Sequence, residues 1–146
     1  MEEVASDLVC PRLANIREEW HWVGPIVSEL LKDNPDVQAI PEDIYSDCKA
    51  GKAHLWVSPH YMLITEFEIT EYSGERNLCI AYAWARERGN KWGREAIPYM
   101  EQVARQNNCA GITFGTRHQA LIDYLCSDMG FRVSTQILKK EIGNPQ

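Results

Sequence analysis

The sequence has 146 residues, of which 45% are hydrophobic and 25% are charged. These values are typical of one globular domain with its own core, and they exclude a disordered or fibrous chain. The formal net charge of -6 excludes the concentrated basic surface that nucleic-acid binding requires, so we expect cations, amines or proteins as partners.

Cysteine usage and the N-terminal residues indicate a reducing compartment. The five cysteines are odd in number and have no Cys-x-x-Cys spacing, so the sequence predicts neither a disulfide framework nor a metal site. The first residues are acidic where a secretory signal would be basic, and no apolar run approaches the roughly 20 residues that span a bilayer. We therefore expect a single soluble domain over residues 1–146 in the cytoplasm, with no nucleic-acid or membrane partner.

The N-terminal third is expected to be mostly helical. A short strand at residues 4–9 is followed by residues 15–32, where apolar side chains recur at helical spacing and Pro25 predicts a kink. Pro35 follows the end of this helix. A second helix at residues 41–48 begins with a proline, which is favourable in a first turn.

The middle of the chain changes to the period-two pattern of β-strands. Apolar residues alternate with their neighbours over residues 53–69 across a turn at residues 58–60, which predicts an antiparallel hairpin. A turn at residues 73–76 leads to a third strand at residues 77–86, and a three-strand meander results. Four apolar residues of the third strand are expected to share one face: Leu78, Ile80, Tyr82 and Trp84.

The C-terminal half alternates helices with strands. Residues 94–108 and 119–129 have amphipathic helical patterns, residues 110–114 form a short apolar strand between them, and residues 132–142 form a last strand. The sequence therefore predicts an α/β (α+β) fold with a mixed, mostly antiparallel central sheet flanked by helices on both faces.

The order of elements over residues 81–138 resembles the second half of the fold of GNAT N-acetyltransferases. In that family the fourth strand ends in a turn of the form Arg/Gln-x-x-Gly-x-Gly/Ala, and amides at the start of the next helix hold the coenzyme A pyrophosphate. Arg88 and Gly93 match this turn, with Lys91 at the first glycine. A register two residues earlier keeps Gly89 as the first glycine and puts Lys91 at the second.

The resemblance implies acetyl-CoA as the cofactor. Lys91 and Arg94 would supply charge where glycine amides are missing, and strand amides near Tyr82 to Trp84 would polarise the thioester carbonyl. A solvated turn before an amphipathic helix is the alternative explanation of these residues. The implied coenzyme-binding set is Tyr82, Trp84, Arg88, Gly89, Lys91, Gly93 and Arg94.

The same resemblance implies a general acid on the last helix and a base on the meander. Counting back from Gly130 puts Cys126 where the family has the tyrosine that protonates the coenzyme A thiolate, and Tyr124 lies two residues away on a different helical face. Tyr124 as the acid and Cys126 as a small buried apolar residue both stay open. Glu66 and Glu68 share one strand face and are the candidate bases, and a plain solvated face is the alternative reading.

Three segments are also similar to GNAT-like proteins encoded by tailed bacteriophages: Leu55-Trp56-Val57, Ile64-Thr65-Glu66 and Gly115-Thr116-Arg117. This resemblance implies a non-catalytic virion, assembly or host-interaction protein that keeps the fold with a degenerate coenzyme site. Its partners would be proteins, its location the host cytoplasm or the virion, and its interface anchors Trp20, Trp22 and Trp92.

Two functions therefore stay open at the level of the sequence. The first is an acetyl-CoA-dependent N-acetyltransferase (acyltransferase) that acts on a small-molecule or peptide amine. The second is the non-catalytic protein with protein partners. A homodimer that pairs or exchanges the last strand is a third expectation, and the charges of Lys139, Lys140 and Glu141 would equally protect that edge from association.

Overall fold

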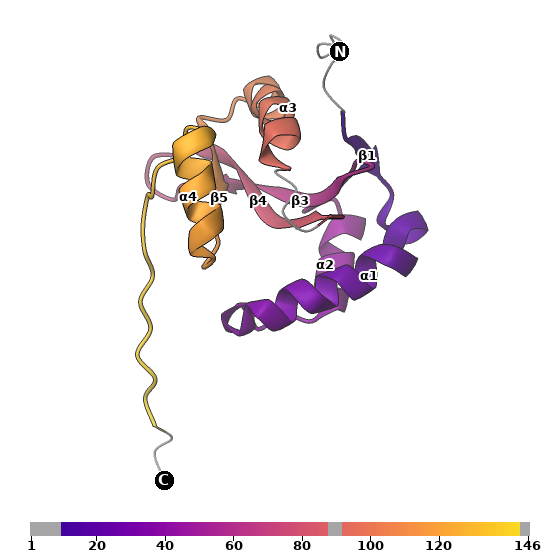
Figure 1. Ribbon diagram of the computed structural model, residues 1–146, viewed down its shortest axis with the longest axis horizontal. Coiled ribbons are helices and arrows are strands. Elements are labelled where there is room, and N and C mark those ends of the chain that lie inside the picture. The colour runs from indigo at the N-terminus through magenta and orange to yellow at the C-terminus, as the bar shows by residue number, and fades with distance from the viewer. Residues whose placement is uncertain (1–9, 88–91, 144–146) are drawn as a thin grey trace. The chain divides into compact units, whose positions relative to one another are not determined.

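The computed structural model describes residues 10–87 and 92–143 (Figure 1). It divides into two compact units, one ending at Gly115 and one beginning at Thr116. The strand predicted at residues 4–9 lies outside the described residues. No helix in the described ranges is long and apolar enough to cross a membrane.

The first unit is built on a five-stranded sheet whose strand order follows the chain order. Neighbouring strands are antiparallel except for the last pair, which is parallel. The predicted meander is confirmed, and a short edge strand that the sequence did not predict is added to it. The strands are β1 (Arg12–Ala14), β2 (His54–Val57), β3 (Tyr61–Ile69), β4 (Arg76–Ala85) and β5 (Gly111–Phe114).

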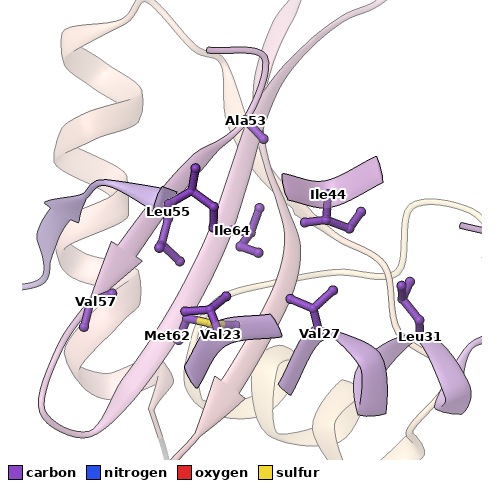
Figure 2. Close-up of a cluster of buried hydrophobic side chains, with 10 residues drawn as sticks. Val23, Val27, Leu31, Ile44, Ala53, Leu55, Val57, Met62 and Ile64 are labelled. Carbon is purple, nitrogen blue, oxygen red and sulfur yellow. The ribbon is translucent and has the colours of Figure 1, made fainter. Parts of the chain in front are cut away.

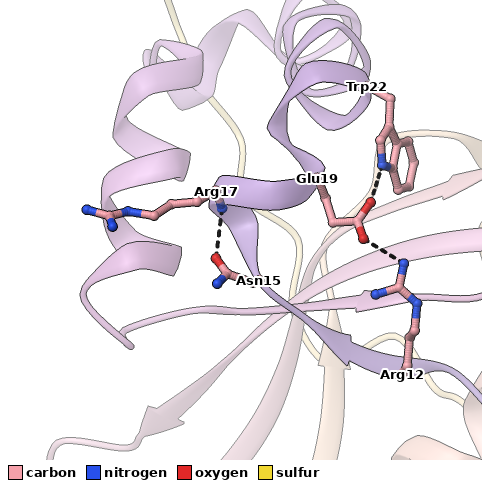
Figure 3. Close-up of polar contacts among 5 residues, drawn as sticks. All are labelled: Arg12, Asn15, Arg17, Glu19 and Trp22. Carbon is pink, nitrogen blue, oxygen red and sulfur yellow. Dashed lines mark hydrogen bonds and ion pairs between the residues drawn. The ribbon is translucent and has the colours of Figure 1, made fainter.

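Helix α1 (Ile16–Asp33) follows β1 directly and confirms the first predicted helix. The Asn15 side chain caps it by accepting a hydrogen bond of 3.0 Å from the Arg17 backbone N–H (Figure 3). The Glu19 carboxylate accepts hydrogen bonds from Trp22 and, at 2.6 Å, from Arg12 (Figure 3). The Trp22 bond and then the Arg12 bond lower the pKa of Glu19, so this carboxylate ties α1 to β1 in its charged form.

Helix α2 (Pro41–Lys49) follows a short 3-10 turn (Pro35–Val37) and begins at the predicted proline. α1 and α2 pack on one face of the sheet, where the main core lies (Figures 1 and 2). Side chains at helical spacing on α1 face side chains at period two on β2 and β3. The buried core residues are Ile16, Val23, Val27, Leu31, Ile44, Ala53, Leu55, Val57, Met62 and Ile64.

Helix α3 (Gly93–Gln106) covers the opposite face of the sheet (Figure 1). Its residues Ala96, Ile97 and Met100 are buried. The ring of Tyr99, also on α3, packs edge-on against Trp56 of β2 with 6.0 Å between ring centroids. The chain therefore has the predicted mixed, mostly antiparallel sheet with helices on both faces.

The second unit contains helix α4 (Gln119–Asp128), which confirms the last predicted helix. The strand predicted at residues 132–142 is wrong, because residues 130–143 contain no strand. Their apolar side chains are exposed, with Ile137 and Leu138 each 91% exposed. An alternating segment becomes a strand only where a neighbouring strand accepts its backbone hydrogen bonds, and no strand among the described residues pairs with this one.

Candidate functional site

Strands β4 and β5 stop pairing part-way along β4. Ile80 and Phe114 are the last paired residues, whereas β4 continues to Ala85. The pairing of β4 with β3 shifts register at the same point, so that Ala81 has no partner and forms a β-bulge. Beyond this bulge, β4 has β3 on one side and, among residues 10–87 and 92–143, no paired strand on the other.

The bulge corrects a prediction about β4. Leu78 and Ile80 pair with residues on the α3 face of β3, whereas Tyr82 and Trp84 pair with Ile64 and Met62 on the α1 face. The sequence placed all four side chains on one face because a period-two count assumes a continuous pleat. One extra residue reverses the direction of every side chain that follows it.

The backbone direction of β4 follows from one hydrogen bond beyond its end. The Arg86 N–H donates to the His60 carbonyl at 2.8 Å, so Arg86 points its backbone groups toward β3. Since these groups alternate along an antiparallel strand, those of Ala83 and Ala85 point toward the unpaired edge. The sequence predicted polarising amides near Tyr82 to Trp84, and within that range Ala83 is the residue whose backbone groups point toward this edge.

Helix α3 begins with two residues of the predicted coenzyme set, Gly93 and Arg94. Gly93 is buried and Arg94 is exposed in the first turn, where the Glu95 and Ala96 amides donate to the Trp92 carbonyl at 3.1 and 2.9 Å. Glu95 follows, and its buried Oε2 atom has no hydrogen-bond partner among the described residues. Arg88, Gly89 and Lys91 lie outside the described residues.

Trp92 is buried at the start of α3, with 7% of its surface exposed. Its ring centroid lies 5.9 Å from that of Phe114, the last residue of β5. Trp20 and Trp22 are partly buried and pack against the main core. The role of these three tryptophans as interface anchors stays a prediction, and each of them contributes to packing within the first unit.

The two candidate bases lie together on the α1 face of the sheet, as the sequence predicted. A carboxylate oxygen of Glu66, one of Glu68 and the Cys79 sulfur all lie within 4.8 Å of one another. The Thr113 hydroxyl donates a hydrogen bond of 3.3 Å to Glu68. Burial, then the charges of Glu68 and Asp47, raise the pKa of Glu66, which suits a group that accepts a proton.

Tyr82 lies near Glu66, and both Tyr82 and Trp84 pack against the main core. Burial first, and then the Glu66 and Asp47 charges, raise the pKa of Tyr82. The Trp84 ring lies 6.4 Å from that of Trp22 on α1. Their side chains therefore belong to the α1 face, while the open edge of β4 is formed by backbone.

Comparisons with known proteins decide the fold. A ribosomal-protein-alanine N-acetyltransferase from Brucella melitensis is 12% identical, with a TM-score of 0.65 over 90% of this chain and 98% of that one. A Trypanosoma brucei acetyltransferase is 13% identical, with a TM-score of 0.64 over 90% and 98% of the two chains. A Bacillus halodurans protein has a TM-score of 0.70 at 12% identity over 90% and 99%. The chain has the GNAT fold.

The similarity to GNAT structures is one of fold, since every identity quoted above is below 15%. No protein-family model matches the sequence, and no curated protein matches it.

The predicted acid of the GNAT site lies in the second unit. Tyr124 and Cys126 are both half-buried on α4, on either side of the buried Leu125. The role of Tyr124 as a general acid stays a prediction. Of the predicted site residues, the structure brings together Glu66 and Glu68 and sets Tyr82 beside them.

Cys79 and Thr113 are the site residues that sequence reasoning missed. They join the two glutamates because Glu66 pairs with Cys79 across β3 and β4, and Cys79 pairs with Thr113 across β4 and β5. Such a group depends on strand register. The sequence contained one usable signal, the period-two spacing of Glu66 and Glu68, but no spacing connected it with Cys79.

Proposed function

We propose that the chain is an acetyl-CoA-dependent N-acyltransferase that acts on a primary amine. The observation that carries the proposal is the open edge of β4 beyond the bulge at Ala81, and α3 is the next helix along the chain. An edge with free amides fits a ligand that itself carries amides along an extended chain. Acetyl-CoA would supply the acyl group as a thioester.

Different residues of this chain would bind different parts of the coenzyme. Amide groups of Ala83 and Ala85 would hold the extended chain of the coenzyme and polarise the thioester carbonyl, next to Tyr82 and Trp84. The first turn of α3 would bind the pyrophosphate through its amides and Arg94. The remaining coenzyme-binding residues of the proposal are Arg88, Gly89, Lys91 and Gly93.

The chemical step is a nucleophilic attack by the amine on the thioester carbonyl. Glu66 or Glu68 would take the proton that the amine gives up as the C–N bond forms. Tyr124 would donate a proton to the sulfur as the C–S bond breaks. The carboxylates, together with the net charge of -6, favour an acceptor that arrives as a cation, either a small molecule or a peptide.

Isothermal titration with acetyl-CoA and with free CoA tests the coenzyme site. We expect micromolar binding that is lost in Arg94→Glu, because this exposed side chain would then repel the pyrophosphate. Arg17→Glu is the matched control, since Arg17 is also exposed in the first turn of a helix. The absence of heat from the folded wild-type protein at high ligand concentration would refute the proposal.

The second candidate function is a non-catalytic virion, assembly or host-interaction protein, as the similarity to bacteriophage proteins implies. Two observations favour it. The buried Trp92 ring occupies space beside Phe114, where β4 and β5 separate, and Glu95 places a carboxylate in the turn that would bind an anion. A folded protein that binds neither acetyl-CoA nor CoA, but has protein partners, is the outcome that this function predicts.

A homodimer is compatible with either function, and we include it in the proposal. Residues 130–143 expose four large apolar side chains, and in the part of the chain that the structure describes β5 pairs with a strand on one side only. Sedimentation equilibrium of the full chain would measure the dimer directly. A monomer at all concentrations tested would exclude it.

A further inference from the structure

Three potential metal ligands from two neighbouring strands meet on the α1 face of the sheet. Glu66 and Glu68 come from β3 and Cys79 from β4, and their donor atoms all lie within 4.8 Å of one another. We propose that these three side chains bind a zinc ion, with an exchangeable water as the fourth ligand.

The sheet itself holds this arrangement in place. Glu66 and Cys79 are paired across β3 and β4, and Glu68 is two residues along the same strand, so all three side chains point from one face. Thr113, which pairs with Cys79 from β5, donates a hydrogen bond of 3.3 Å to the Glu68 carboxylate. In a preorganised metal site, rigid elements hold the ligands, and hydrogen bonds from neighbouring residues orient them.

The distances agree with a zinc ion after small side-chain rotations. Zinc bonds are about 2.0–2.2 Å to carboxylate oxygen and about 2.3 Å to sulfur, which places tetrahedral ligands roughly 3.3–3.7 Å apart. The observed separations of up to 4.8 Å need to close by about an ångström. Glu68 is exposed and Glu66 half-buried, so both carboxylates have room to rotate.

The thiol distinguishes this group from an ordinary pair of surface acids. Carboxylates are ligands for magnesium and calcium, but both ions require more oxygen ligands than this site offers. A sulfur ligand selects thiophilic divalent ions, of which zinc tolerates a mixed oxygen and sulfur set. The Asp47 carboxylate on α2 acts electrostatically on Glu66 and adds to the negative potential that attracts a cation.

Zinc binding does not depend on the proposed acyl transfer, although the two would compete for the same carboxylates. A zinc-bound Glu66 or Glu68 could not accept a proton from an amine. If both proposals hold, zinc inhibits the enzyme; if only this one holds, zinc still binds.

Titration of the reduced protein with Co²⁺, followed by displacement with Zn²⁺, tests the site. We expect one equivalent of Co²⁺ to produce a near-ultraviolet thiolate-to-cobalt charge-transfer band, together with the visible bands of a tetrahedral ion, and Zn²⁺ to abolish both. Cys79→Ser should remove the charge-transfer band. Glu68→Gln should weaken Zn²⁺ binding by at least about tenfold. Loss of a residue that only orients a ligand already costs that much, and Glu68 would be a ligand itself.

Two matched controls distinguish this site from adventitious binding. Cys10 carries an exposed thiol and Glu71 an exposed carboxylate outside the cluster, so Cys10→Ser and Glu71→Gln should leave the band and the affinity unchanged. The proposal is overturned by absence of Co²⁺ binding, by binding without the charge-transfer band, or by a band that survives in Cys79→Ser. Circular dichroism of each variant confirms folding, and none of these readouts requires acyl-transfer activity.

Discussion

The hydrogen bond between Trp56 and Thr65 allows a quantitative test of how the sheet is held beside the bulge. The Trp56 indole N–H donates to the Thr65 hydroxyl at 2.9 Å. Thr65 is 1% exposed and lies at the point where the register of β3 against β4 shifts. Thr65→Val keeps the volume of the side chain and removes the acceptor, so its effect is electrostatic rather than a change in packing.

The expected cost follows from what the substitution leaves behind. A buried donor without a partner costs about 1–3 kcal/mol, and because Trp56 is only partly buried, we expect the lower limit of about 1 kcal/mol. Trp56→Phe leaves the more deeply buried Thr65 hydroxyl without its partner and should cost more. The double variant should be less destabilised than the sum of the two single variants, by about 1 kcal/mol.

Urea denaturation measures the free energy of unfolding of the wild type, the two single variants and the double variant. With a denaturant slope of about 1–3 kcal/mol per molar, a loss of about 1 kcal/mol moves the midpoint of Thr65→Val down by roughly 0.3–1 M at an unchanged slope. Strict additivity in the double variant would show that the two groups do not interact. An unchanged midpoint for Thr65→Val would also refute the reasoning, since the bond would then contribute nothing.

Three further predictions concern charge and the core. Glu19→Gln should lower stability at neutral pH, and the difference from wild type should vanish as the pH falls through the lowered pKa of Glu19, as measured by thermal unfolding across pH. Because the pKa of Glu66 is raised, Glu66→Gln should stabilise the protein above that pKa and have no effect below the ordinary glutamate value; in an active enzyme it should also remove the acidic limb of the pH–rate profile. Leu55→Ala, at a 1% exposed core position, should cost about 2–5 kcal/mol in urea denaturation, whereas Leu13→Ala, at 60% exposure on the adjacent strand, should stay within about 0.5 kcal/mol.

Periodicity predicted the elements that bury a regular face of their own. The helices over residues 15–32 and 94–108 and the hairpin after Ala53 were found within a few residues of their predicted bounds. Each has an apolar pattern that only one kind of backbone can place on the core. The segment at residues 132–142 has a comparable pattern and is not a strand, because pairing requires a partner that local sequence does not specify.

The candidate site was predicted only as far as it depends on local pattern. Glu66 and Glu68 were paired correctly because they are two residues apart on one strand. The prediction of which sheet face Tyr82 and Trp84 occupy was wrong because of the bulge at Ala81. This bulge follows from how β3 and β4 pair, and an alanine gives no sequence signal for it. Cys79 was missed because its neighbours Glu66 and Thr113 come from other strands, and local sequence does not specify which residues pair across strands.

The residues at the end of β4 and at the start of α3 favour different functions. Ala83 and Ala85 lie on the α3 face of β4, and both are small and half-buried. Trp92 is buried against Phe114, beside the point where β4 and β5 separate, and its large ring takes up space on that same face. In the proposed enzyme, a residue whose burial stabilises the fold would therefore also reduce the room for the coenzyme.

Replacing this ring separates its two effects. Trp92→Ala should destabilise the protein by about 3–5 kcal/mol, as large-to-small changes at buried aromatic positions do. If the ring fills space that the coenzyme needs, the folded variant should bind acetyl-CoA more tightly than the wild type in the same titration. Trp92→Phe keeps most of the packing and should show a smaller change in both quantities. Lower stability with unchanged or weaker binding would show that Trp92 acts in packing alone and does not restrict the coenzyme site.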